Sequence, residues 1–177
     1  MRSFTFISGN LGLDLAGTVS HRRSDRSDLL DGPDDLARWT VQAGILDTPP
    51  HVDESALATG KALREAVYRL AVPSAGRSSA DRELVNRAAA GPPAGVLLRA
   101  DGEVERAGDL DAALSTVARA AIELLGGPLA ARVKECGGEA CTRLYLDVSR
   151  GSSRRWCDMQ ECGNRAKAAG FRARRRG

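Results

Sequence analysis

The sequence predicts an α+β protein with two parts, a mostly helical N-terminal domain over residues 1–128 and a small cysteine-rich module over residues 129–177. Three observations lead to this prediction. Apolar residues recur at helical spacing over most of the first part, one Asp-Gly pair separates two short β-prone runs, and every cysteine lies between positions 136 and 162. Of the 177 residues, 42% are hydrophobic and 28% are charged, which is typical of a folded protein rather than a disordered one.

The first 32 residues carry weaker patterns than the segments that follow. Phe4 and Phe6 alternate with polar neighbours and predict a short strand. Residues 11–19 fit either a strand or a helix, because their leucines alternate along the chain and also share one helical face. Residues 21–32 are polar and charged, and predict a loop.

Stronger signals predict the rest of the N-terminal domain. Proline at the first helical position, followed by two aspartates, favours a helix start at Pro33. Asp101-Gly102 is the favoured pair for a type I′ turn, and Asp109 is placed to cap a helix. The predicted segments are a helix from Pro33, helices over about residues 53–70 and 79–90, and a hairpin over residues 95–108. A last helix begins at Asp109 and ends at Gly126-Gly127-Pro128.

The four cysteines form two pairs with a spacer between them. Their pattern is Cys136-x4-Cys141-x15-Cys157-x4-Cys162, and two close pairs separated by a hairpin-length spacer are typical of a structural Zn²⁺ site. Two disulfides or four free thiols are the alternatives, and disulfides fit poorly with a chain that shows no export signal. Four thiolates leave no open coordination position, so we expect a structural Zn²⁺ and not a catalytic one.

The residues around the second cysteine pair strengthen the metal prediction. Asp158 and Glu161 resemble a capping box, which makes Asp158 the N-cap of a helix and brings Cys157 and Cys162 side by side. Gly170 is placed to end that helix. Apolar residues alternate over residues 144–148 and predict a strand. The predicted order of knuckle, hairpin and helix is that of a treble-clef-like zinc module.

Positive charge is concentrated in this module. Residues 132–177 hold 12 basic and 5 acidic side chains, whereas residues 1–131 hold 14 basic and 18 acidic ones. Such an asymmetry indicates contact with a polyanion, although a solvated tail explains a basic end equally well. Arg165, beside the metal, has a second interpretation as a donor to knuckle carbonyls. The predicted nucleic-acid contacts are Arg150, Arg154, Arg155, Asn164, Arg165, Lys167, Arg172, Arg174 and Arg175.

The segment Cys-Gly-Asn-Arg at residues 162–165, with its flanking "YLDVSRGSSRRWCDMQE" and "AKAAGFRARRR", resembles the CGNR zinc-finger family. The region over about residues 8–125 is similar, more loosely, to the ABATE-type domain that accompanies it, described as a stress-induced transcription regulator. That family carries a Leu-Asp-Phe-(Val)-Asn-Thr motif, which here reads Leu-Asp-Leu-Ala-Gly-Thr over residues 13–18, with Gly17 where Asn is usual. The resemblance implies a bacterial regulator with a DNA-binding zinc module. A candidate ligand pocket comprises Asp14, Thr18, His21 and Arg22; a solvated loop is the alternative for the last two.

We therefore expect a transcription regulator that binds double-stranded DNA through the zinc module, with an N-terminal regulatory domain and a homodimer as the default assembly. An RNA-binding or ribosome-associated zinc protein is the alternative, since phosphate contact serves either. We do not expect an enzyme, because Asp14, His21 and His51 form no catalytic pattern. No signal peptide and no stretch of about 18 apolar residues is visible, so the expected location is the cytoplasm, at the nucleoid when bound to DNA, without membrane association.

Overall fold

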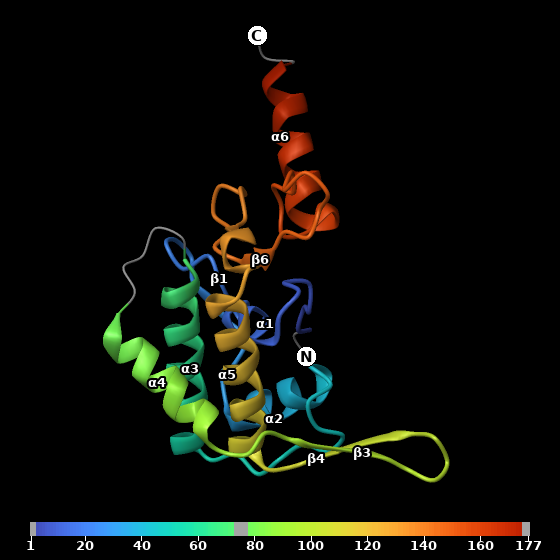
Figure 1. The fold of residues 1–177 in the computed structure, drawn as a ribbon. Coiled ribbons are helices and arrows are strands. Elements are labelled where there is room, and N and C mark those ends of the chain that lie inside the picture. Colours follow the sequence, from blue (N-terminus) through green and yellow to red (C-terminus); the bar gives the residue numbers. More distant parts are fainter. Residues whose placement is uncertain (1–2, 73–77, 175–177) are drawn as a thin grey trace.

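The structure, a computed structural model, describes residues 3–72 and 78–174, without the side chains at 173 and 174 (Figure 1). Helices form about half of it, together with three separate two-stranded antiparallel sheets in this described part. The helical body contains α1 (Leu11–Ala16), α2 (Pro33–Gln42), α3 (Glu54–Ala71), α4 (Ser79–Ala90) and α5 (Leu110–Gly126). The hairpins are β1 (Val19–Ser20) with β2 (Ser27–Asp28), β3 (Gly95–Leu98) with β4 (Val104–Ala107), and β5 (Val133–Glu135) with β6 (Leu144–Leu146).

Local capping signals account for where the helices begin. The side chains of Asp53, Ser78 and Asp109 each accept a hydrogen bond from the backbone N–H three residues later, at the starts of α3, α4 and α5. Pro33 is the first residue of α2, as predicted. The undecided segment forms α1, because Asn10 caps it by accepting from Gly12 N.

The main core lies among the long helices of the body. Trp39, Leu36, Leu63 and Val117 are almost completely buried there. Gly12 allows α1 to approach α5, since a Cβ at that position would lie 2.7 Å from the Cβ of Ala121. This close approach shows that α1, which carries the first four residues of the Leu-Asp-Leu-Ala-Gly-Thr motif, packs directly on α5.

A second core joins the helical body to the cysteine-rich module. Its buried members are Leu13, Ala71 and Leu124 from the body and Val133, Leu144 and Leu146 from the module. Leu146 N also donates to Ser8 O over 2.8 Å. The module therefore does not depend on its own small core alone, and Figure 1 shows it at one end of the helices, with α6 (Asn164–Arg174) projecting beyond it.

Four local predictions were wrong. Residues 21–32, predicted as a loop, contain the short strand β2, which pairs with β1. Phe4 and Phe6 lie outside any strand, because Phe4 is buried against the helical core instead of pairing in a sheet. The turn at Asp101-Gly102 is not type I′: only Gly102 has a positive φ, and Gly102 N donates to Arg99 O, which fits a type I turn with a glycine bulge. Gly170 does not end the last helix, which continues to Arg174.

Candidate metal centre and nucleic-acid interface

The four cysteine sulfurs converge on one point in the module. Their Sγ atoms all lie within 4.8 Å of one another. Cys157 Sγ is 3.8 Å from Cys141 Sγ and 3.7 Å from Cys162 Sγ. A tetrahedral Zn²⁺ site with Zn–S bonds of about 2.3 Å has sulfur–sulfur edges of about 3.8 Å, so these side chains fit the ion closely.

The first cysteine pair is held by a tight knuckle between β5 and β6. Cys136 N donates to Arg143 O over 2.9 Å, and Cys141 N donates to Gly138 O over 3.0 Å. Gly138 leaves room for the sulfurs, because a Cβ there would lie 3.1 Å from Cys141 Cβ and 3.6 Å from Cys162 Sγ. Gly137 N donates to Arg155 O over 2.9 Å, which fixes the knuckle to the segment carrying the second pair.

The second pair meets across the start of the last helix. Asp158 is an N-cap, as predicted, and its side chain accepts from Gln160 N. The expected capping box is replaced by a π-helical turn, Met159–Gly163, closed by a 2.9 Å hydrogen bond from Gly163 N to Asp158 O. The turn brings Cys162 beside Cys157. Glu161, expected to complete the box, instead lies 3.9 Å from Arg165.

Four clustered cysteines can all be thiolates only when a cation balances their negative charge. Burial, and the neighbouring sulfurs Cys141 and Cys136, raise the pKa of the Cys162 thiol to about 12. A Zn²⁺ ion supplies the positive charge that lets such thiols bind as thiolates. The site would accept the ion through four sulfurs, which makes its role structural.

The hairpin of this module pairs the two strands on either side of the first cysteine pair. The strand predicted over residues 144–148 is β6, and it pairs with β5 across the knuckle, so that Val133 lies opposite Leu146. Tyr145 is buried, and its hydroxyl donates to Arg154 O over 2.7 Å. Val148 is exposed because the strand has already ended.

Arg154 lies inside the module although it was predicted to contact nucleic acid. Its guanidinium donates to Trp156 O over 2.9 Å, to Ile7 O over 3.4 Å and also to Cys157 O. The same group stacks 4.4 Å from the centre of the Tyr145 ring. Arg154 thus takes the carbonyl-binding role that the sequence suggested for Arg165.

Asp147 is the residue of this region that sequence reasoning missed. It is completely buried and accepts from Lys134 Nζ over 2.6 Å, from Ser149 Oγ over 2.6 Å and from Arg154 N over 3.1 Å. The hydrogen bonds from Lys134 and Ser149 hold its pKa well below the usual range. The alternation around Asp147 resembled an ordinary half-buried strand, so only its contacts reveal that it shapes the loop before Arg154.

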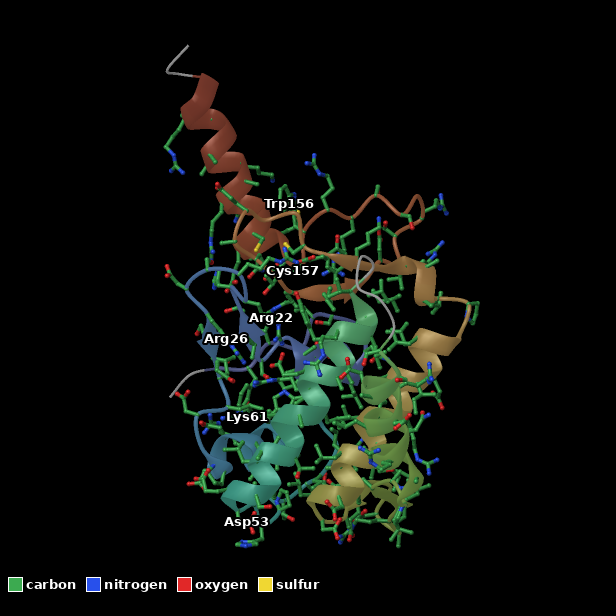
Figure 2. The ribbon with its side chains drawn as sticks, turned by 90° about the vertical axis from the view of Figure 1, so that its left-hand side faces the viewer. Arg22, Arg26, Asp53, Lys61, Trp156 and Cys157 are labelled. Atoms are coloured by element: carbon green, nitrogen blue, oxygen red, sulfur yellow. The ribbon has the colours of Figure 1, made fainter. Side chains whose placement is uncertain are left out.

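Most of the other predicted nucleic-acid residues are exposed on the module. They are Arg150, Arg155, Asn164, Arg165, Lys167 and Arg172. Arg165 and Arg172 line one open cavity of about 610 Å³, together with His21, the glycines of the knuckle and Trp156. Figure 2 shows Trp156 and Cys157 at the base of α6, with Arg22 beneath them on the helical body. The Arg174 side chain and Arg175 lie outside the described residues.

The four candidate ligand-pocket residues have different surroundings. Buried Asp14 accepts from Ser8 N over 3.0 Å, and burial raises its pKa. The Thr18 hydroxyl donates to Leu15 O over 2.8 Å. His21 lines the cavity beside the cysteines. Whether these residues bind a ligand stays a prediction.

Arg22 connects the helical body to the module. Its side chain, 9% exposed, forms an ion pair with Glu65 and lies 3.9 Å over the Tyr68 ring. Burial lowers its pKa, and Glu65 opposes that effect. Its backbone N–H donates to Thr142 Oγ1 over 3.1 Å, next to Cys141.

Comparison with known families agrees with this arrangement. The ABATE family, described as "putative stress-induced transcription regulator", matches residues 9–128. The chain belongs to the ABATE family. The CGNR zinc finger matches residues 132–175 of this ABATE protein, so the resemblances on both segments are confirmed and the cysteine cluster is a zinc-finger site. No curated protein matches the chain. Among the described residues, no helix of the ABATE protein has the length and apolar character needed to cross a membrane.

Proposed function

We propose that this protein is a bacterial transcription regulator whose zinc module binds double-stranded DNA and whose ABATE domain is regulatory. The observation that carries the proposal is the placement of Arg165 and Arg172, which line the same cavity beside the cysteine knuckle. Both are exposed, seven positions apart on α6, and α6 begins at the metal site. A cationic helix held by a metal suits contact with DNA phosphates.

The family description and the charge distribution support the same function. The ABATE description names transcription regulation, and the module carries the excess of basic over acidic side chains. In the proposed function, the protein acts by binding DNA and not as an enzyme. It does so in the cytoplasm, at the nucleoid. Regulation would reach the module through the shared core and Arg22, which tie it to α1, α3 and α5.

Binding to DNA tests the proposal. Sequencing of DNA that copurifies with the protein supplies fragments, and fluorescence anisotropy then measures their affinity over a range of salt concentrations. We expect affinity to fall with salt, and replacement of Arg165 and Arg172 by alanine to reduce the slope by about 0.9 for each phosphate that the protein no longer neutralises.

The matched control replaces Arg82 and Arg87, two exposed arginines of α4, by alanine. It removes the same charge from the helical body and should bind like the wild type. Equal affinity and salt slope in all three proteins would exclude the assigned surface. Preference for structured RNA over duplex DNA in competition would assign the module to RNA instead.

A further inference from the structure

The β3–β4 hairpin projects from the helical body as an arm, at the end opposite to α6 (Figure 1). Its apolar side chains are unusually exposed: Val96 is 71% exposed, Leu97 60%, Leu98 73% and Val104 43%. An isolated two-stranded hairpin is marginally stable in water and gains stability from further strands. The arm therefore has the composition of a sheet that a neighbouring strand completes.

The hydrogen-bond pattern shows which edge of the arm is open. Arg99 N donates to Glu103 O, and the strands pair Leu97 with Glu105. Because bonded and non-bonded pairs alternate in an antiparallel ladder, the backbone groups of Val96 and Leu98 point away from β4. Within the described structure, neither residue has a backbone partner on that side.

The other edge of the arm is already covered. Asp47 N donates to Arg106 O over 3.0 Å, and Arg106 N donates to Asp47 Oδ2 over 2.7 Å. Proteins usually protect an edge strand with charges, proline or a bulge. Asp47 does this for β4, whereas the β3 edge, Gly-Val-Leu-Leu, has no charged residue and no proline.

We propose that β3 pairs antiparallel with β3 of a second copy of this chain, so that the two arms form one four-stranded sheet. The outward-pointing groups fix the register. Val96 exchanges backbone hydrogen bonds with the partner's Leu98, and Leu98 does so with the partner's Val96. Leu97 then lies directly opposite the partner's Leu97, on the twofold axis.

This register makes the surface complementary to itself. On one face, Leu98 lies beside the partner's Val96, and on the other face the two Leu97 side chains meet. Arg99 lies opposite the partner's Gly95, so no like charges meet across the new edge. Such pairing is isologous and closes at two copies.

The charges of the arm disfavour nucleic acid and anionic membranes as partners of the β3 edge. Arg99 and Arg106 stand against Asp101, Glu103 and Glu105, which gives the arm a net negative charge. With one more acidic than basic side chain, the arm offers nucleic acid or an anionic membrane no net positive surface to bind. The neutral Gly-Val-Leu-Leu strand needs no opposite charge in its partner, so an identical strand can pair with it. The inference goes beyond the proposed DNA binding, and its test contains no DNA.

Sedimentation equilibrium of the zinc-loaded full chain over a range of concentrations tests the proposal. We expect a reversible dimer for the wild type. Leu97→Lys should raise the dimer dissociation constant at least about tenfold, because like charges directly opposite each other destabilise a strand pair. Within its own arm the new lysine lies opposite Glu105, so the hairpin itself should be preserved. The double variant Leu97→Glu/Glu105→Lys keeps an opposite-charge pair within its own arm and should also be monomeric. A mixture of it with Leu97→Lys should restore a 1:1 dimer.

Two further variants separate edge pairing from a loss of folding. Val96→Pro removes an outward N–H without breaking a bond inside the hairpin, and should weaken the dimer. Val104→Lys changes the same apolar face on β4, away from the open edge, and should leave the dimer unchanged. Circular dichroism and zinc content check that each variant folds. A wild type that stays monomeric, or a dimer that survives Leu97→Lys and Val96→Pro, would overturn the proposal.

Discussion

At the scale of single residues, adjacent arginines have opposite surroundings. The Arg154 guanidinium binds backbone carbonyls beside Cys157 and stacks on Tyr145. Arg155 is exposed, 5.3 Å over the Trp156 ring. The buried Asp147 carboxylate orients the segment that carries both arginines by accepting a hydrogen bond from Arg154 N. One position therefore supports the metal site, and its neighbour is available to a partner.

Replacing Arg154 by alanine should therefore destabilise the zinc module. Hydrogen bonds from a charged donor are worth about 1.5–3 kcal/mol each, so we expect the free energy of unfolding to fall by about 2–3 kcal/mol and zinc to be released at lower chelator concentration. Chelator titration with a colorimetric zinc indicator measures the release. Arg155→Ala is the matched control and should keep its zinc; identical titration curves would contradict the assigned role of Arg154.

At the scale of elements, ion pairs hold neighbouring helices together. Arg69 of α3 donates to Asp81 of α4 through two bonds, Nε to Oδ2 over 2.8 Å and an NH2 contact of 2.5 Å to Oδ1. The hydrogen bonds from Arg69 lower the pKa of Asp81 below its ordinary value. A carboxyl group with a lowered folded-state pKa stabilises the fold above its ordinary pKa, and this contribution is lost as the pH falls through the lowered value.

Asp81→Asn should consequently show a pH-dependent effect. Arg69 is half-exposed, so we expect a loss of only about 1 kcal/mol at pH 7. The difference from wild type should persist down to about pH 5 and close below about pH 4. Urea unfolding at each pH measures it. Glu83→Gln, exposed on the same helix, should show no comparable difference, and a gap for Asp81→Asn that widens in acid would refute the assigned sign.

At the scale of the whole molecule, the zinc module and the ABATE domain share a hydrophobic core. Leu13 and Leu124 of the helical body pack with Val133 and Leu144 of the module. The large core around Trp39 and Leu63, in contrast, contains none of the module residues that the structure describes. Metal binding should therefore stabilise the module strongly and the distant helices weakly.

Removal of zinc tests this division. Structural Zn²⁺ contributes about 10–16 kcal/mol of apparent binding free energy in small zinc modules. On chelation, we expect amides of residues 133–163 to lose protection from hydrogen exchange, while α2 and α3 keep theirs. Hydrogen-exchange mass spectrometry measures both regions, and zinc added back should restore the protection. Unchanged exchange in the module would show that the metal does not hold it.

Short-range signals explain why much of the fold could be predicted. Asp53, Ser78 and Asp109 cap helices through atoms three residues away, and the spacing of the four cysteines predicts a Zn²⁺ site. The caps and the spacing within each cysteine pair depend on nearby residues only, whereas the hydrogen bond from Gly137 N to Arg155 O brings the two pairs together. The prediction of a strand at Phe4 and Phe6 was wrong for the opposite reason. Burial of Phe4 in a core formed by distant residues outweighed the local alternation of apolar and polar residues.

The sequence by itself determined α2 to α5, the zinc ligands and the basic character of the module. Only the tertiary structure decided that Arg154 and Asp147 support the metal site and that β6 pairs with β5. It also decided that no other described segment pairs with the β3 edge. The physical reason is that caps and ligand spacing are local. Burial, ion pairs and free strand edges depend on where residues far apart in the chain come to lie.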